Sequence, residues 1–365
     1  MKKVFWIIFY LMITACVDPI TFDIPSVAFQ LVVDGLITDE PGPYTVYLSR
    51  ARALNADLST RVPLFGAKVT IRSDAGETEA LTEGTEYGTF KTKTIQGKVG
   101  RSYSIKITTA EGKVYESNPE KMAAVGEVES VSFEFEANAV VNNEGIETQA
   151  DRFNIYTDGR VVTGNENYIR WRLVGTYQIE TFPQFIRTAN PAGVLVPNPP
   201  ACSGYAYRNS QLTYTGPCSC CYCWVNDYGV PAVSDDLLLS GGLFKNVRVG
   251  NVPINRRTFY DKYYVEVQQE ALTRSAFTYW KLVRAQKDGA NSLFQPPLAK
   301  LKGNIHSVAD AGEQVQGYFG AAGIKRKGIF ITKQDIPYRL LPIDTLTLNC
   351  AYNSNSSNIK PSFWK

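Results

Sequence analysis

Short runs in which every second residue is apolar recur from residue 29 onward, and turn-forming Gly, Asp, Asn or Pro residues separate them. Successive side chains of a strand point to opposite faces, so each run predicts a strand with one buried face. Short strands divided by turn residues are typical of an antiparallel sandwich. The runs before residue 124 are 30–37, 44–49, 67–71, 90–95, 103–107 and 114–117. We therefore expect a mainly β chain that begins with a sandwich of six or seven strands over residues 28–124.

Three segments of this region share a pattern of glycines placed just before strands. They are Phe65-Gly66-Ala67-Lys68-Val69-Thr70-Ile71, Gly88-Thr89-Phe90 and Gly100-Arg101-Ser102-Tyr103-Ser104-Ile105. Together they resemble the transthyretin-like and carboxypeptidase-regulatory-like Ig folds. The resemblance implies an Ig-like sandwich that serves as a spacer or a binding module. It implies nothing about a reaction, because one fold supports many functions.

A second, larger β-rich domain is predicted over residues 125–350. The alternating runs here are 128–135, 153–156, 168–174, 176–179, 263–270, 314–320 and 328–331. Residues 138–150 are polar and predict a turn region. One notable helix is expected at residues 273–287, because Phe277 and Trp280 fall on one side and Asp288-Gly289 ends the pattern. Residues 351–365 are predicted to form a C-terminal tail, whose Asn- and Ser-rich part before Phe363-Trp364 is expected to be mobile.

The N-terminus carries an export signal. Lys2 and Lys3 precede the apolar run 4–13, which is too short to span a bilayer as a helix. Ile13-Thr14-Ala15-Cys16 follows and resembles the lipobox of bacterial lipoprotein precursors. We therefore expect residues 1–15 to be a lipoprotein signal peptide, Cys16 to be lipidated, and residues 16–27 to form a tether. Two or more acyl chains anchor a protein stably to a membrane.

Composition narrows the range of partners. Removing Lys2 and Lys3 from the 38 Lys and Arg residues leaves 36, against 35 Asp and Glu. This neutral balance, without a polybasic block, argues against a nucleic-acid partner. No second apolar run approaches twenty residues, so the mature chain is expected to be soluble apart from its lipid. The 21 Tyr and 18 Phe residues suit β-structure and aromatic contact surfaces.

Six further cysteines remain, five of them in the Pro-rich, aperiodic loop 181–223. Long loops in compact domains are usually functional or covalently stapled. An exported protein meets an oxidising compartment, so these thiols are disulfide candidates, and fifteen pairings are possible. Cys220 and Cys221 are expected to pair outward rather than with each other. The candidates are Cys202, Cys218, Cys220, Cys221, Cys223 and Cys350.

A soft-metal site for Cu(I) or Zn is the alternative for the four cysteines of segment 218–223. The spacing argues against zinc, because structural zinc sites usually draw two close cysteine pairs from separate segments. The only histidine, His306, lies far along the chain, so no nearby histidine is available as a further metal ligand. We therefore expect disulfides and no metal.

Catalytic motifs are not found. His306 with Ser307 or Asp310 could be read as a triad, but adjacent positions rarely supply one and no G-x-S-x-G elbow is present. A structural or surface histidine is the simpler interpretation. Asp235-Asp236 could ligate calcium or form a catalytic dyad, and an N-cap before a short turn is the simpler interpretation. With no P-loop, Rossmann or H-E-x-x-H motif, we expect a protein without catalytic residues or cofactors.

Aromatic residues concentrate in and beside the cysteine-rich loop. Aromatic side chains supply rigid contact area at low entropic cost, so they are candidates for a binding surface. The alternative is that they pack over the disulfides. The residues are Tyr205, Tyr207, Tyr214, Tyr222 and Trp224.

Several motifs together resemble one family. They are the lipobox, Leu31-Val32-Val33-Asp34-Gly35-Leu36-Ile37-Thr38, Cys220-Cys221-Tyr222-Cys223-Trp224, Gly303-Asn304-Ile305 and Gly317-Tyr318-Phe319. The family comprises uncharacterised Bacteroidota outer-membrane lipoproteins with a domain of unknown function, commonly encoded beside SusC-type TonB-dependent transporters.

The resemblance implies a non-enzymatic binding or accessory subunit of such a β-barrel transporter, anchored in the outer membrane. A structural or assembly role in the envelope is one alternative, and an enzyme acting on polysaccharide or peptide is another. Only one acidic residue, Asp18, follows Cys16 closely. Surface exposure and a periplasmic orientation therefore both stay open.

Overall fold

The computed structural model describes residues 30–51, 62–143, 146–163, 166–229, 231–234, 242–289, 301–342, 345–350 and 355–365. The predicted signal peptide, the tether and Cys16 lie outside these ranges. Within them strands dominate, so the prediction of a mainly β chain is confirmed. No helix in this part of the chain is long and apolar enough to cross a bilayer.

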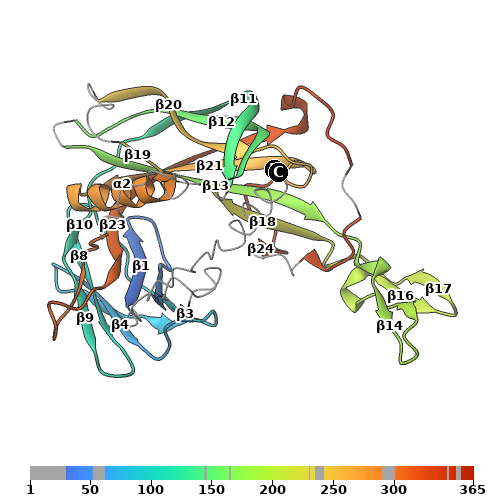
Figure 1. Cartoon of the computed structure of the whole chain (residues 1–365), viewed down its shortest axis with the longest axis horizontal. Coiled ribbons are helices and arrows are strands. Elements are labelled where there is room, and N and C mark those ends of the chain that lie inside the picture. The colour runs from blue at the N-terminus through green and yellow to red at the C-terminus, as the bar shows by residue number, and fades with distance from the viewer. Residues whose placement is uncertain are drawn as a thin grey trace, which may run out of the picture.

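The N-terminal region forms a sandwich of two facing sheets (Figure 1). The first sheet contributes β1 (Leu31–Thr38), β2 (Thr45–Arg50), β3 (Val62–Pro63), β6 (Thr82–Glu83) and β7 (Thr89–Lys91). The second sheet contains β4 (Lys68–Ser73), β5 (Thr78–Ala80), β8 (Ser102–Thr108), β9 (Val114–Ser117), β10 (Glu120–Lys121) and β22 (Ile305–Ser307). All but the last of these strands come from the region for which the sequence predicts a sandwich.

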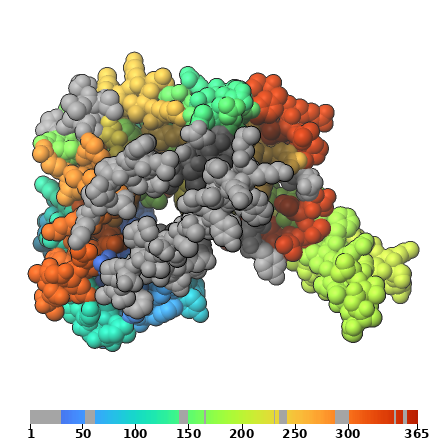
Figure 2. Space-filling view, viewed as in Figure 1, coloured from blue at the N-terminus to red at the C-terminus, as the bar shows by residue number. Residues whose placement is uncertain are grey.

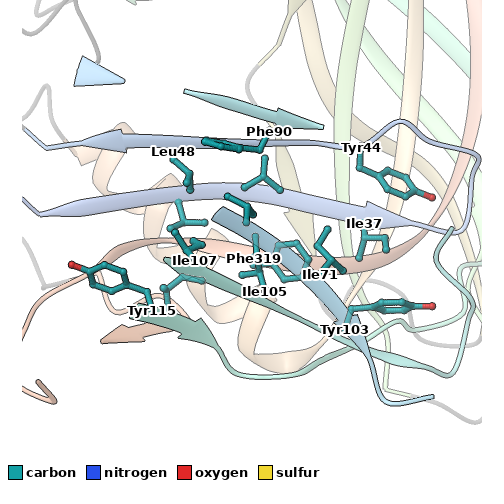
Figure 3. Close-up of a cluster of buried hydrophobic side chains, with 14 of the residues drawn as sticks. Ile37, Tyr44, Leu48, Ile71, Phe90, Tyr103, Ile105, Ile107, Tyr115 and Phe319 are labelled. Carbon is teal, nitrogen blue, oxygen red and sulfur yellow. The ribbon is translucent and has the colours of Figure 1, made fainter. Parts of the chain in front are cut away.

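The alternating pattern sets which face of each strand is buried. In β8, Tyr103, Ile105 and Ile107 are at most 1% exposed, and the residues between them are only partly buried. Leu48 and Phe90 of the facing sheet meet them in the same core (Figure 3). Burying such a side chain fully contributes about 1.5–3 kcal/mol, so the apolar positions select the register of the sandwich.

Two segments from late in the chain complete this sandwich. β22 pairs with β9, and β23 (Gln316–Thr332) runs parallel to β1. Ile305 and Phe319 lie in the same core as the N-terminal strands. The predicted division after residue 124 therefore does not separate the two cores along the chain. Alternation reveals strands, but it carries no information about which distant strand is the partner.

β23 then continues into the second half of the molecule, where it pairs antiparallel with β21 (Lys262–Leu272). The predicted runs 314–320 and 328–331 are one strand of 17 residues. The long sheet continues through β13 (Tyr168–Glu180), β18 (Tyr222–Tyr228), β19 (Ala232–Ser234) and β24 (Ser356–Ser357). A three-stranded sheet of β11 (Val128–Asn143), β12 (Ile146–Arg160) and β20 (Leu243–Pro253) lies over it (Figure 1).

The core of this second half is aromatic. Trp171 is 1% exposed and meets Phe244 edge-on, with ring centroids 5.6 Å apart. Its indole N–H donates to Gln269 Oε1 at 2.9 Å, so the buried polar atom is satisfied. The prediction of a turn region at 138–150 is wrong, because β11 and β12 continue there as a hairpin. Asn138, Asn142 and Asn143 interrupt the apolar alternation, so the sequence there does not resemble a half-buried strand.

The predicted helix is confirmed as α2 (Arg274–Gly289). Thr273 precedes it, and the Thr273 hydroxyl accepts a hydrogen bond from the N–H of Ala276 at 3.2 Å, as an N-cap residue does. Glu120 of β10 accepts hydrogen bonds from the hydroxyls of Thr273 (2.6 Å), Ser275 (3.1 Å) and Tyr318 (2.5 Å). One buried carboxylate thus joins the helix start, the sandwich and β23.

The predicted C-terminal tail packs against the body in the residues that the structure describes. β24 pairs with β18, and Trp364 is only 5% exposed. Its ring meets Trp224 edge-on at 6.5 Å and Phe330 at 5.5 Å. Aromatic contacts thus hold Trp364 against the sheet.

Candidate functional site: a disulfide-stapled arm

The cysteine-rich segment 181–223 projects from the body as an arm (Figures 1 and 2). It leaves the body at the end of β13 and returns at the start of β18. We call residues 181–221 the arm. Its elements are η2 (Pro183–Phe185), β14 (Arg187–Ala189), β15 (Leu195–Pro197), η3 (Ala201–Ser203), β16 (Tyr205–Arg208) and β17 (Gln211–Tyr214).

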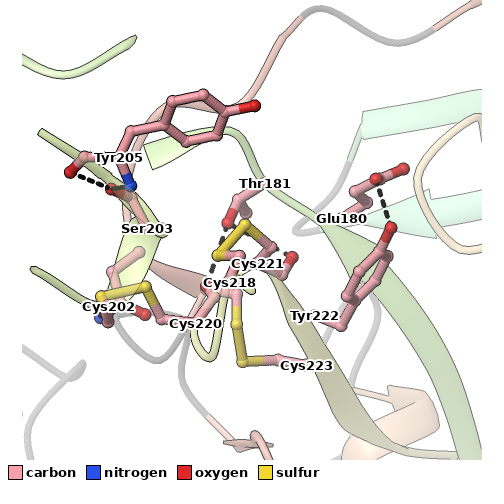
Figure 4. Close-up of a disulfide and its surroundings, with 12 residues drawn as sticks. Glu180, Thr181, Cys202, Ser203, Tyr205, Cys218, Cys220, Cys221, Tyr222 and Cys223 are labelled. Atoms are coloured by element: carbon pink, nitrogen blue, oxygen red, sulfur yellow. Dashed lines mark hydrogen bonds between the residues drawn. A yellow bond between two sulfur atoms is a disulfide. The ribbon is translucent and has the colours of Figure 1, made fainter. Parts of the chain in front are cut away.

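Three disulfides join the six candidate cysteines (Figure 4). Cys202 pairs with Cys220 and Cys218 with Cys221, so two bridges lie within the arm. Cys223 pairs with Cys350 and ties the base of the arm to the C-terminal segment. The adjacent Cys220 and Cys221 belong to different bridges, as expected. Each of the six thiols is therefore committed to a sulfur–sulfur bond, whereas zinc and Cu(I) bind free thiolates.

Turn chemistry shapes the two hairpins of the arm. Asn209 and Ser210 both have positive φ, 48° and 62°, between β16 and β17, as a two-residue type I′ turn requires. In the β14–β15 hairpin, the Asn190 side-chain oxygen accepts hydrogen bonds from the N–H groups of Ala192 and Val194, each at 3.0 Å. Local hydrogen bonds and disulfides thus hold an arm that has little apolar core of its own.

The predicted binding residues fall into two groups. Tyr207, Tyr214 and Tyr222 are 41%, 63% and 44% exposed, and Tyr205 packs edge-on against Tyr214 across the hairpin at 5.5 Å. Trp224 is only 9% exposed and lies under the C-terminal segment, so it does not join the exposed set. Its ring packs against Trp364, which removes Trp224 from the candidate contact surface.

Three exposed apolar residues of the arm were not predicted as binding residues. Phe185, Val194 and Leu195 are 54%, 58% and 62% exposed. Their exposure on one projecting element makes them further candidates for a contact surface. The sequence does indicate this exposed segment, because the apolar run 194–196 lies in a Pro-rich stretch and lacks the alternation of apolar and polar residues typical of a half-buried strand.

The base of the arm is held by polar contacts around Glu180. The Tyr222 hydroxyl donates to Glu180 Oε1 at 2.7 Å (Figure 4), and the Tyr260 hydroxyl donates to Oε2. The bond to this carboxylate raises the pKa of Tyr260 to about 12 and also raises the pKa of Tyr222. The N–H of Thr181 donates to the carbonyl of Cys221 at 2.8 Å. These contacts fix the direction in which the arm leaves the body.

The remaining residues singled out in the sequence do not gather around the arm. His306 lies on β22 in register with Glu116, and its side chain is exposed while that of Ser307 is buried. The two side chains therefore point to opposite faces of the strand, which is incompatible with a triad through Ser307. Asp235-Asp236 lies outside the described residues.

Comparisons with known proteins add a family but no activity. No curated protein matches the chain. One similar solved structure is called "Putative membrane anchored protein from Corynebacterium diphtheriae". It is 10% identical with a TM-score of 0.18, and the match covers 67% of this chain and 55% of that one. The chain thus spans about half the length of that protein, and a likeness this low carries no argument.

A family model covers most of the sequence. The match runs over residues 17–328, from just after the predicted lipidation site to the middle of β23. The chain belongs to the family described as a domain of unknown function, DUF4249.

Proposed function

We propose that this protein is a non-enzymatic, lipid-anchored binding or accessory subunit that contacts a membrane partner through its arm. One observation carries the proposal: a segment fixed by disulfides projects from the body and exposes Phe185, Val194, Leu195, Tyr207 and Tyr214. Interfaces are enriched in aromatic residues near their centres, and large exposed apolar residues grouped on one element are uncommon on monomers that bind nothing.

Rigidity supports the same role. Binding through a flexible loop loses free energy to the ordering of that loop, whereas a prefixed element avoids this loss. Cys202–Cys220 and Cys218–Cys221 hold the arm before any partner arrives, and the Glu180 contacts set its direction. Such an arm can bind without first being folded by its partner.

The partner we propose is a SusC-type TonB-dependent β-barrel transporter in the outer membrane. The lipobox ending at Cys16 supports the membrane anchor, and the resemblance to outer-membrane lipoproteins supports the transporter. A lipid at Cys16 would keep the arm near the membrane and raise its effective concentration toward a membrane protein.

The anchor is tested by radiolabelled palmitate. The wild-type lipoprotein is expected to incorporate the label, and Cys16→Ala is expected to incorporate none. Recovery of unlabelled wild-type protein from the culture fluid would overturn the anchor, and with it the role at the membrane.

The partner is tested by purifying the intact lipoprotein from native membranes and identifying co-purified proteins by mass spectrometry. A TonB-dependent barrel is expected with the wild type. We expect the double variant Leu195→Asp/Tyr214→Asp to lose it at least tenfold. Val308→Asp is the matched control, because Val308 is 57% exposed on the sandwich, away from the arm. If the double variant still co-purified with the barrel, the arm would be excluded as the contact surface. If no barrel co-purified with the wild type, the transporter would be excluded as the partner.

A further inference from the structure

A cavity of about 490 Å³ opens where the arm meets the body. Its walls come from the end of β13, the loop before β21, η4 (Lys333–Asp335) and the segment after η4. Glu180, the residue that holds Tyr222 at the arm base, is one of its lining residues. The volume falls in the range of sites for small molecules, which is about 300–1,000 Å³.

The inner wall of this cavity is apolar. Phe259 is fully buried at its base and packs in the aromatic core of the second half, 5.6 Å from the ring of Tyr263. Phe182 and Leu340, both partly buried, add apolar surface. A ligand with an aromatic or aliphatic body would remove this surface from water, at roughly 25 cal/mol for each Å² buried.

The rim of the cavity is cationic. Arg256, Lys333 and Arg339 line it, and none of the three forms an ion pair with a carboxylate in the described part of the chain. Arg256 Nη1 donates to the carbonyl of Pro342 at 3.0 Å, and Lys333 Nζ lies 5.1 Å from the centre of the Tyr260 ring. These contacts hold the cations at the cavity without neutralising them.

Glu180 is the one carboxylate among the described residues that line this cavity, and its oxygens already accept hydrogen bonds. Both oxygens of Glu180 accept hydrogen bonds, one from Tyr222 and the other from Tyr260. Three cations against one hydrogen-bonded carboxylate leave a positive balance among the lining residues, which attracts anions.

We propose that this cavity binds a small organic anion with an aromatic or aliphatic body. The acidic head would lie against Lys333 and Arg339, and the body would lie over Phe259 and Leu340. This inference does not rest on a transporter partner, because binding can be measured on the isolated protein.

The proposal is tested by calorimetric titration of the detergent-solubilised full-length lipoprotein with 2-naphthoate and with its neutral analogue 2-naphthamide. Detergent alone gives the blank for partition into micelles. Saturable binding of naphthoate, at least tenfold tighter than that of naphthamide, is expected. Equal affinities would overturn the anion requirement, and no saturable binding of naphthoate would overturn the site.

Variants locate the binding. Lys333→Gln/Arg339→Gln is expected to weaken naphthoate binding at least tenfold, whereas Lys68→Gln, an exposed lysine on the sandwich, should leave it unchanged. Thr345→Trp places a bulky ring at the exposed rim and is expected to block binding with an unchanged melting temperature. Undiminished binding in the Lys333/Arg339 variant, with the fold intact, would place the anion elsewhere and refute the proposal.

Discussion

Gly317 lies directly against Val33, where the parallel pairing of β23 with β1 begins. A Cβ built on Gly317 would be 1.8 Å from the carbonyl oxygen of Val33. Gly317 also has φ +96°, a conformation that residues with a side chain rarely adopt. On the other side, a Cβ on Gly303 would lie 1.7 Å from the carbonyl oxygen of Gly317. Three backbone segments therefore approach one another as closely as only glycine allows.

Gly317→Ala is expected to reduce the free energy of unfolding by at least about 3 kcal/mol, because backbone strain adds to a clash that no side-chain rotation relieves. Gly76→Ala is the matched control. Gly76 has a similar φ of +87°, but a Cβ at this position would meet nothing within 4 Å, so a loss of about 1 kcal/mol is expected. Urea unfolding measures both. Equal losses would mean that the contact with Val33 does not matter.

Removing the Cys223–Cys350 bridge with a pair of alanines is expected to destabilise the protein more than removing Cys218–Cys221. The first bridge spans 127 residues and the second only 3. Loop-closure entropy gives about 5 kcal/mol for the first and about 2 kcal/mol for the second. Non-reducing urea unfolding measures the loss of unfolding free energy in each double variant. A larger loss without Cys218–Cys221 than without Cys223–Cys350 would contradict the disulfide pairing.

Glu120→Ala is expected to lower the free energy of unfolding by about 3 kcal/mol, because three hydroxyls lose their shared acceptor in a buried place. The neighbouring Lys121→Ala, exposed on the same strand, should change it by less than about 0.5 kcal/mol. Thermal unfolding followed by circular dichroism tests both. A small effect of Glu120→Ala would show that the helix start and the sandwich are joined by apolar packing alone.

Glu79 provides a test by pH. Burial raises its pKa, but hydrogen bonds from the Thr94 side chain and from the N–H groups of residues 93–95 outweigh burial and lower the pKa to about 2. A folded pKa below the unfolded value means that the stabilisation is complete above about pH 5 and is lost as the pH falls toward 2.

Glu79→Gln is therefore expected to cost about 1–2 kcal/mol at pH 7, after allowance for solvent screening, and less at each step down to pH 2.5. Glu77→Gln, which removes only an exposed pair with Lys98, should change stability by less than about 0.5 kcal/mol at every pH. Urea unfolding at pH 7, 4 and 2.5 measures both. A difference independent of pH would exclude the carboxylate as the cause.

Local patterns in the sequence were sufficient to predict most strands, the helix and the direction in which Cys220 and Cys221 pair. Each of these depends on neighbouring residues: alternation in β8, the stop at Gly289, and the strain of a ring between adjacent cysteines. The hairpin beyond Glu136 escaped because polar residues such as Asn142 and Asn143 interrupt the apolar alternation there.

The features that escaped prediction depend on contacts between distant residues. Nothing near Gly317 or Val33 in the sequence says that these two meet. Likewise, the cavity combines Glu180, Phe259 and Lys333 from three separate parts of the chain, and only folding assembles them. Trp224 packs against Trp364, and nothing in the Asn- and Ser-rich tail indicates this contact.

The parallel pairing of β1 with β23 also constrains how the protein can be made. A growing chain emerges N-terminus first, so the core around Ile37 and Phe90 stays incomplete until Phe319 has been synthesised. An incomplete sandwich with an open strand edge invites aggregation, and a holding chaperone would have to shield it. A product that stopped before β22 would lack Ile305 and Phe319, so the core that is synthesised first would never be completed.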